Sequence, residues 1–350
     1  MSDLVLGLDV GGTGSRIALA PLDVRTAAPS GGSSGAPSGS TRRELAGPRV
    51  RIGPDGSSVP AVVDELLARA GEAWPEVLDP AADDGRLCGV ALGATGLASL
   101  VDEPDALPAR MAQRLRVPAA AAIDAVTAHL GALDGAGGAI VALGTGAVAV
   151  GHPGSTLPSA AGERAGSAAC PAGWRRVDGW GHLLGDRGGG AWLGRRGLQE
   201  ALRAHDGVDP AGAALLAAGR RRLGEPSDWP AQLYTRDDRA GVLAGFAADV
   251  VELAAGGDAL AHRLVESAGR EAAASALAAL APEHPARAVL TGGLAAAGGA
   301  LTAGFTTEIA ARRPETEIAE VVGDPLDGAL HLARLAAASG LAPQEGFLWT

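Results

Sequence analysis

The chain has 350 residues, a formal net charge of −11 and a hydrophobic share of 47%. This length and apolar content predict two domains with sizeable cores. The acidic balance argues against a nucleic-acid binder, because neutralising phosphates needs a basic surface. We find no signal-peptide pattern and no apolar run of the ~18 residues that a membrane span needs. Cys88 and Cys170 form no disulfide or metal pattern, so we expect a cytoplasmic protein with no membrane partner.

Arginine supplies every one of the 29 positively charged Lys+Arg residues, because the chain contains no lysine. A Walker A loop needs a lysine at the phosphates, and a protein kinase needs a lysine on a strand. The sequence therefore excludes both of these nucleotide-binding schemes.

The predicted elements alternate between strands and helices along the chain. Strands are expected at 4–10, 15–23, 49–53, 138–143, 147–151, 287–295 and 318–322, and a buried strand that runs into a small-residue loop is expected over 87–100. Residues 117–133 are expected to begin as a strand and pass into a helix. Helices are expected at 59–74 and 325–339, with a long helical region over 191–280. Residues 26–47 are rich in Gly, Ser and Pro and predict a long mobile loop, centred on 27–40.

A glycine turn joins two apolar strands twice, within residues 4–20 and again within 139–151. The repetition suggests two related α/β halves that face each other across a cleft, where ligands commonly bind. A tight glycine turn exposes backbone N–H groups and forms an anion-binding nest. Asp9 ends the first strand, and a carboxylate beside a phosphate suits a Mg²⁺ ion held between them.

A single glycine turn is more commonly a plain hairpin, so the joint order of three motifs carries the functional interpretation. The sequence reads DVGGTGS, then LGTGA, then LTGGL. The predicted ATP-binding residues are Gly11, Gly12, Thr13, Gly14, Ser15, Gly144, Thr145, Gly146, Gly292 and Gly293.

This ordered set resembles the phosphate 1, phosphate 2 and adenosine motifs of the actin-like ATPase superfamily. The segments AAIDAVTAHLGAL and VDGWGHLLGDRGGGAWLG resemble its N-acetylglucosamine kinase branch, grouped with the BadF/BadG/BcrA/BcrD ATPases. The resemblance implies an α/β fold of two ribonuclease-H-like lobes around a central cleft. We expect an N-terminal lobe of residues 1–117, completed by the C-terminal helix within 326–350, and a C-terminal lobe of 118–325.

The resemblance also implies roles for individual residues. Asp124 matches the catalytic base that takes the proton of a sugar hydroxyl, although an aspartate there could also cap the following helix. Sugar-binding residues implied by the resemblance are Thr95, Gly96, Asp124, Gly179, Trp180 and Asp186. A packed core aromatic is the alternative for Trp180.

Two departures bear on the substrate. Arg187 stands where the family often has an acidic residue, and its role is open. Gly179 and Trp180 resemble the family segment that lines the 2-position of the sugar, and Asp178 directly precedes them. A carboxylate beside the 2-position suits the ammonium of glucosamine better than the acetamide of N-acetylglucosamine. The alternative is that Asp178 faces solvent and pairs with Arg175 or Arg176.

We therefore expect an enzyme that uses ATP and Mg²⁺ to phosphorylate an amino sugar, glucosamine, at its 6-hydroxyl. N-acetylglucosamine is the alternative substrate, and a non-catalytic sugar-sensing protein on the same fold is the alternative from another class. An activator of 2-hydroxyacyl-CoA dehydratases is disfavoured, because it needs cysteines for an iron–sulfur cluster. The oligomeric state stays open, with a homodimer as one option.

Overall fold

The computed structural model describes residues 3–12, 14–23, 42–53, 56–78, 87–157 and 169–350. The chain divides into two compact units. Unit 1 contains residues 1–137, 153–174 and 321–350, and unit 2 contains residues 138–152 and 175–320. This division differs from the boundary expected near residue 117, since β7 (Ala119–Ile123) pairs with β6 (Leu87–Ala94) inside the sheet of unit 1.

Unit 1 is built on a six-stranded mixed sheet in the order β13-β7-β6-β1-β2-β3. Its three central strands, β1 (Leu4–Val10), β6 and β7, run parallel to one another. The outer strands β2 (Ser15–Pro21), β3 (Arg43–Gly47) and β13 (Leu348–Trp349) pair antiparallel. The expected loop over 26–47 is thus wrong for its last five residues, which form an edge strand, while 27–40 lie outside the described residues.

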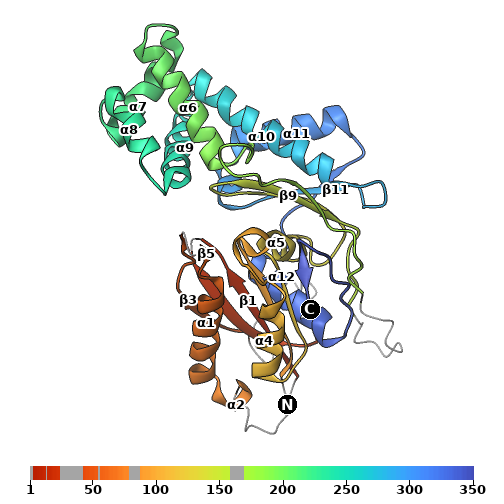
Figure 1. The fold of residues 1–350 in the computed structure, drawn as a ribbon. Helices are drawn as coiled ribbons and strands as arrows, with labels where there is room; N and C mark the ends of the chain where they lie inside the picture. Colours follow the sequence, from red (N-terminus) through yellow and green to blue (C-terminus); the bar gives the residue numbers. More distant parts are fainter. Residues whose placement is uncertain (1–2, 13, 24–41, 54–55, 79–86, 158–168) are drawn as a thin grey trace, which may run out of the picture. The chain divides into compact units, whose positions relative to one another are not determined.

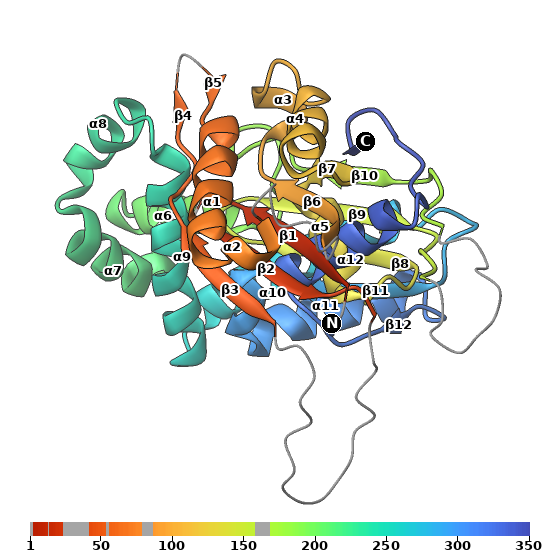
Figure 2. The ribbon, with the colours of Figure 1, turned by 90° about the horizontal axis from the view of Figure 1, so that it is seen from below.

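Helices cover both faces of this sheet. Figure 2 shows α1 (Val59–Ala73) and α4 (Ala106–Leu115) on one face, and α5 (Asp124–Ala132) and α12 (Pro325–Ala337) on the other. Gly7 and Gly89 let α12 approach the strands, since an added Cβ would lie 2.8 Å and 2.6 Å from its backbone. The short helices α2 (Pro75–Leu78) and α3 (Leu97–Leu100) and the small hairpin β4 (Ile52–Gly53) and β5 (Gly56–Ser57) complete the described part of this unit.

Unit 2 has a five-stranded mixed sheet in the order β10-β9-β8-β11-β12. The strands are β8 (Gly138–Leu143), β9 (Ala147–His152), β10 (Arg175–Asp178), β11 (Arg287–Thr291) and β12 (Glu317–Ile318). Its helices are α6 (Gly190–His205), α7 (Ala213–Leu223), α8 (Trp229–Tyr234), α9 (Arg239–Ala255), α10 (Ala259–Ala279) and α11 (Gly299–Arg312). The helical region expected over 191–280 is confirmed as α6 to α10 (Figure 1).

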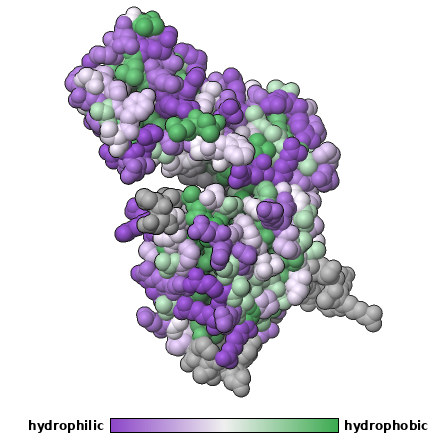
Figure 3. Space-filling view, in the orientation of Figure 1, coloured by the Kyte–Doolittle hydropathy of each residue, from purple (hydrophilic) through white to green (hydrophobic). Residues whose placement is uncertain are grey.

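The core of unit 2 lies where these helices pack on each other and on the sheet. Its largest fully buried side chains are Trp229, Phe246 and Phe305. The visible outer surface of the α7–α8 region is largely hydrophilic, as Figure 3 shows. No single helix among the described residues is long and apolar enough to cross a membrane, although α9 and α10, bent by 118°, meet the criteria of length and composition together.

Candidate active site

The carboxyl ends of three parallel strands of unit 1 bring together the predicted residues Asp9, Thr95 and Asp124. Asp9 lies one residue before the end of β1, and Thr95 and Asp124 directly follow β6 and β7. The Thr95 N–H donates to the Val10 carbonyl at 3.0 Å, which ties the strand ends together. Parallel neighbours end at the same edge of a sheet, and this edge is where open α/β sheets bind ligands.

Asp124 opens helix α5 and is half-buried. Its Oδ1 accepts the Ala125 N–H at 2.9 Å, and the Thr95 hydroxyl donates to the same carboxylate. Burial raises the pKa of Asp124, although the hydrogen bonds from Thr95 and Ala125 oppose the shift and the charge of Asp9 adds to it. The N-cap of α5 is Ile123, with no side-chain capping hydrogen bond, and Asp124 is the first residue of the helix. The helix-cap alternative for Asp124 is therefore wrong, and its raised pKa suits a general base.

Asp9 is the residue that the sequence predicts to bind Mg²⁺. Burial raises the pKa of Asp9, and its ion pair with Arg16, at 2.9 Å from Oδ2, opposes that shift. No cluster of three or more His, Cys, Asp or Glu side chains suited to a metal occurs in the described part of the chain. Mg²⁺ needs only one or two carboxylates when substrate phosphates and water supply its other ligands. The donor chemistry at Asp9 therefore fits a nucleotide-borne Mg²⁺.

The glycine turn after β1 is tied to the segment that follows β3. The Gly11 N–H donates to the Gly14 carbonyl at 2.9 Å and closes the turn. The Ser15 hydroxyl donates to the Pro48 carbonyl at 2.6 Å, so it anchors the turn instead of facing a ligand. Gly12 is exposed, and Thr13 lies outside the described residues. The anion nest predicted in this unit would therefore be formed by the backbone around Gly12 and Gly14.

The second glycine turn, between β8 and β9, is held from one side by helix α6. The Gly190 and Ala191 N–H groups donate to the carbonyls of Gly144 and Thr145 at 2.9 Å and 2.8 Å. The C=O and N–H of a trans peptide point in opposite directions. The N–H groups of Thr145 and Gly146 therefore point away from α6, in a turn where Gly144 and Thr145 are exposed, and this geometry is compatible with the anion nest predicted there.

The third motif lies next to the second in the sheet of unit 2. Strand β11 pairs in parallel with β8, and Gly292 follows directly after it. Gly292 has φ +95°, and an added Cβ would lie 2.4 Å from the Leu143 carbonyl oxygen. Only glycine fits this position. An added Cβ at Gly293 would meet no atom within 4 Å, so the backbone beside β8 is open to a ligand.

The loop between β10 and α6 holds the predicted sugar-binding residues of unit 2. Asp178 is buried, and its Oδ1 and Oδ2 accept the N–H groups of Asp186 and Arg187, both at 2.8 Å. Asp178 and Asp186 have φ of +63° and +55°, which aspartate adopts more readily than most residues. These contacts show that Asp178 shapes the loop, and neither the solvent-facing alternative nor pairing with Arg175 or Arg176 matches its surroundings.

Asp186 is directed toward the second glycine turn. Its Oδ1 accepts the Gly181 N–H at 3.1 Å, and its Oδ2 lies 2.6 Å from the position of an added Cβ on Gly146. Burial raises the pKa of Asp186, and the charge of Asp178 adds to that shift. A cation or a hydrogen-bond donor placed beside Asp186 would therefore stabilise its ionised form.

Trp180 is 65% exposed, which rules out the core-aromatic alternative. The Arg176 guanidinium lies 4.9 Å from its ring centroid and supports the ring by a cation–π contact. Gly179, with φ +75°, turns the chain directly before it. In unit 1, Gly96 has φ +68° and starts the short helix α3 beside Thr95.

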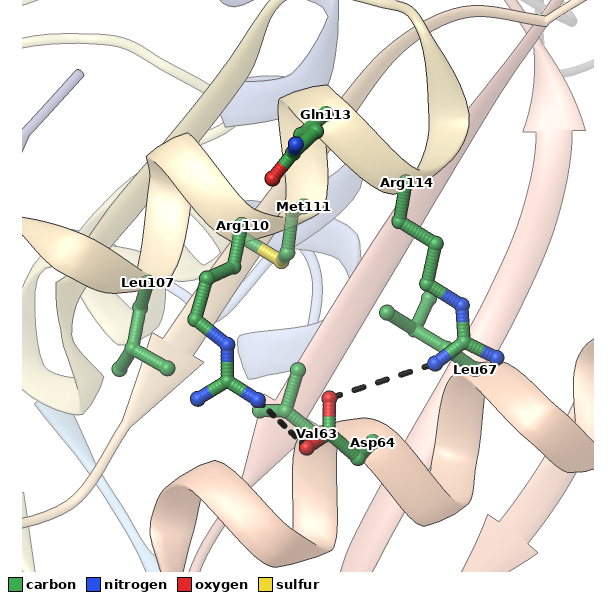
Figure 4. A pocket seen from close by; sticks show the side chains of 8 residues that line it. All are labelled: Val63, Asp64, Leu67, Leu107, Arg110, Met111, Gln113 and Arg114. Carbon is green, nitrogen blue, oxygen red and sulfur yellow. Dashed lines mark hydrogen bonds and ion pairs between the residues drawn. The ribbon is translucent and has the colours of Figure 1, made fainter.

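A groove of about 260 Å³ lies between α1 and α4, away from these motifs (Figure 4). Val63, Leu67, Leu107 and Met111 contribute its apolar lining. Asp64 pairs with Arg110 at 2.6 Å and with Arg114 at 4.0 Å across it. None of the residues predicted to bind ATP or sugar lines this groove.

Sequence reasoning missed Arg16 and Asp324. The Arg16 guanidinium bridges Asp9 and Asp324, at 2.9 Å and 2.7 Å. The position of Arg16 opposite Asp9 across a two-strand hairpin could have signalled its pairing with that carboxylate.

Comparisons with solved structures show which proteins have a similar fold. The chain is similar to a protein from Chromobacterium violaceum provisionally assigned as an N-acetylglucosamine kinase, with 25% identity, TM-score 0.59, and 95% and 99% of the two chains covered. A counterpart from Porphyromonas gingivalis with the same provisional assignment gives 15% identity, TM-score 0.59 and coverage of 95% and 98%. A ROK family glucokinase from Streptomyces griseus, in complex with glucose and AMPPNP, has 18% identity and a TM-score of 0.52, and the match covers 95% of this chain and 99% of the glucokinase.

No curated protein matches the chain. Residues 173–330 match the model of the BadF/BadG/BcrA/BcrD ATPase family, so they include the β10–α6 loop and the third glycine motif. The resemblance expected from the sequence is thereby confirmed: the chain has the actin-like ATPase fold of sugar kinases and, over residues 173–330, matches the BadF/BadG/BcrA/BcrD ATPase family.

Proposed function

We propose that this protein is an ATP-dependent amino-sugar kinase that phosphorylates glucosamine at the 6-hydroxyl. The observation that carries the proposal is the convergence of Asp9, Thr95 and Asp124 at one edge of one sheet. A phosphoryl transfer to an alcohol needs a base for the hydroxyl proton and a site for a nucleotide-borne metal. These residues supply both kinds of group.

Asp124 is the general base in this mechanism. It accepts the proton of the 6-hydroxyl while the sugar oxygen forms a bond to the γ-phosphorus and the bond to the ADP oxygen breaks. Its raised pKa makes the carboxylate a stronger base than an exposed aspartate. Thr95 donates to the carboxylate and orients it. Asp9 would hold Mg²⁺, which neutralises charge on the phosphates when it is bound.

Backbone groups are the proposed phosphate donors, since the chain has no lysine. The N–H groups of Thr145 and Gly146, which follow the exposed Gly144, and the turn around Gly12 and Gly14 carry this role in the proposal. The open backbone at Gly293 suits the flat adenosine portion of the nucleotide.

Asp186 supports the preference for glucosamine. Burial and the neighbouring charge of Asp178 raise the pKa of Asp186, and a cation beside it would offset both effects. The ammonium of glucosamine supplies that cation, and a charge-assisted hydrogen bond contributes about 1.5–3 kcal/mol. Asp178, which sequence reasoning placed at the sugar, acts in this proposal by holding Asp186 in place.

N-acetylglucosamine is the second candidate substrate, favoured by the similarity to the Chromobacterium violaceum protein. A screen of ADP release by the purified protein with ATP, Mg²⁺ and each of glucosamine, N-acetylglucosamine and glucose tests the proposal. We expect glucosamine to give the highest kcat/KM. A higher value for N-acetylglucosamine would reverse the substrate assignment. Sugar binding without ADP release from any sugar would favour a sensing protein instead.

A further inference from the structure

Arg16 links the Asp9 carboxylate to the start of helix α12. It lies on β2 directly opposite Asp9 in the antiparallel register. Its NH2 group donates to Asp9 Oδ2 at 2.9 Å, and its NH1 group donates to Asp324 Oδ2 at 2.7 Å. All three residues belong to unit 1. The guanidinium is therefore shared between two carboxylates, as its planar arrangement of donors allows.

Neighbouring groups fix the far end of this bridge. Asp324 is the N-cap of α12, and its Oδ1 accepts the N–H groups of Leu326 and Asp327 at 2.9 Å and 3.0 Å. The Asp327 side chain in turn accepts the Asp324 N–H at 2.9 Å, which completes a capping box. Helix α12 itself thus holds the Asp324 side chain in place.

A second arginine, Arg42, pairs with residues next to this bridge and does not contact Asp9. Arg42 pairs with Asp327 and, at 3.0 Å, with Glu44. Glu44 in turn lies 3.7 Å from Arg16. Arg42 therefore stabilises the same part of the fold as Arg16 and differs from it in having no contact with the proposed metal carboxylate.

We propose that Arg16 is a positioning residue that makes metal binding at Asp9 depend on the nucleotide. The proposal rests on the assignment of Asp9 to Mg²⁺ in the proposed function. A free divalent cation approaching Asp9 meets the fixed positive charge of Arg16, which opposes its binding. The negative phosphates of ATP offset that repulsion, so the metal binds as part of a metal–nucleotide complex.

Binding of Mn²⁺ to the nucleotide-free protein, followed by electron paramagnetic resonance, tests this inference. Without the guanidinium, Asp9, Glu44 and Asp324 lose their shared counter-charge, so we expect Arg16→Ala to bind Mn²⁺ about tenfold more tightly than wild type, or more. Arg42→Ala, the matched control, should bind Mn²⁺ as wild type does. In Arg16→Ala combined with Asp9→Asn, the gain should disappear.

Three outcomes overturn the proposal: equal Mn²⁺ affinity in wild type and Arg16→Ala, no Mn²⁺ binding by either, or a gain that persists in the double variant. Circular dichroism melting of each variant accompanies the titrations. Arg16→Gln, which keeps a hydrogen-bond donor without the charge, replaces Arg16→Ala if that variant does not fold, with the same expected gain.

The metal titration is separate from the test of function. If wild type releases ADP with a sugar while its Mn²⁺ affinity equals that of Arg16→Ala, the inference about Arg16 fails and the kinase proposal stands. If no sugar supports ADP release, the kinase proposal fails, and the titration still reports whether Arg16 controls the affinity of Asp9 for a free metal ion.

Discussion

Asp178 Oδ1 accepts the backbone N–H of Asp186 at 2.8 Å, so one aspartate fixes the position of the other. The second oxygen of Asp178 accepts the Arg187 N–H, and the side chain is buried. The segment that precedes helix α6 thus depends on a carboxylate that sequence reasoning assigned to the substrate.

Replacing Asp178 with alanine removes both acceptors and leaves two N–H groups without them. We expect kcat/KM to fall about tenfold or more for glucosamine and less for glucose, because Asp186 moves and only glucosamine has the ammonium that Asp186 binds in the proposed function. The melting temperature should fall as well, since unpaired buried N–H groups are costly. Steady-state kinetics with both sugars checks this. Unchanged kinetics with both sugars would show that Asp178 does not position Asp186 for the substrate.

Asp124→Asn tests the general base. The amide keeps the shape of the side chain but cannot take a proton, so kcat should fall about 100-fold or more while sugar binding is largely retained. Asp102→Asn, an exposed carboxylate in the same unit, is the control and should leave both quantities unchanged. Near-wild-type turnover in purified Asp124→Asn would remove Asp124 from the mechanism.

The pH profile of kcat/KM provides a second test of Asp124. The base works only when it is deprotonated, and burial raises its pKa above the ordinary aspartate range. Activity should therefore decline, as pH falls, at a higher pH than an unperturbed aspartate would give. An acid limb at or below the ordinary aspartate pKa would contradict this assignment.

Gly292→Ala tests the close approach of β11 to β8. The new Cβ would lie 2.4 Å from the Leu143 carbonyl oxygen, at a φ of +95° that alanine rarely adopts. We expect a loss of about 2 kcal/mol or more in the free energy of unfolding. Gly293→Ala, which meets open space, is the neighbouring control and should melt within a degree or two of wild type. Equal melting temperatures for the two variants would argue against the strained packing.

The strands and helices with clear periodicity could be predicted from the sequence. Helices α1 and α12 have apolar residues at helical spacing, and β1 and β8 are apolar runs that end at glycine turns. Strand β3 was missed because it is a short, partly exposed edge strand that follows a Gly/Ser-rich segment. Composition indicates only that such a segment lacks a core, and it does not show where strand pairing resumes.

The site could be predicted only where it follows from the ends of strands. Asp9, Thr95 and Asp124 each lie at or just after the end of a predicted strand, and they converge because the structure pairs these strands in parallel. The Arg16–Asp324 contact spans 308 positions and depends on the return of the chain at α12. The buried position of Asp178 depends on a left-handed backbone conformation that residue type alone does not reveal.

His331 provides a prediction about stability. It lies buried on α12, with Nε2 2.9 Å from the Ser155 hydroxyl oxygen. Burial lowers the pKa of His331 to about 4, and Arg334 adds to the shift while Asp134 opposes it. The imidazole is therefore neutral in the folded protein over a pH range in which an exposed histidine becomes charged.

The direction of the pH effect follows from proton binding. Between pH 6.5 and about 4, the unfolded chain holds a proton on this histidine that the folded protein does not, so stability falls as pH decreases through that window. The loss attributable to His331 amounts to roughly 3 kcal/mol at the acid end. Urea unfolding of wild type and His331→Gln at several pH values between 7.5 and 4.5 measures it. The difference in unfolding free energy between the two proteins should shrink as pH falls, whereas His205→Gln, at an exposed position, should follow wild type throughout. A constant difference between wild type and His331→Gln across the series would show that His331 does not titrate in the unfolding equilibrium.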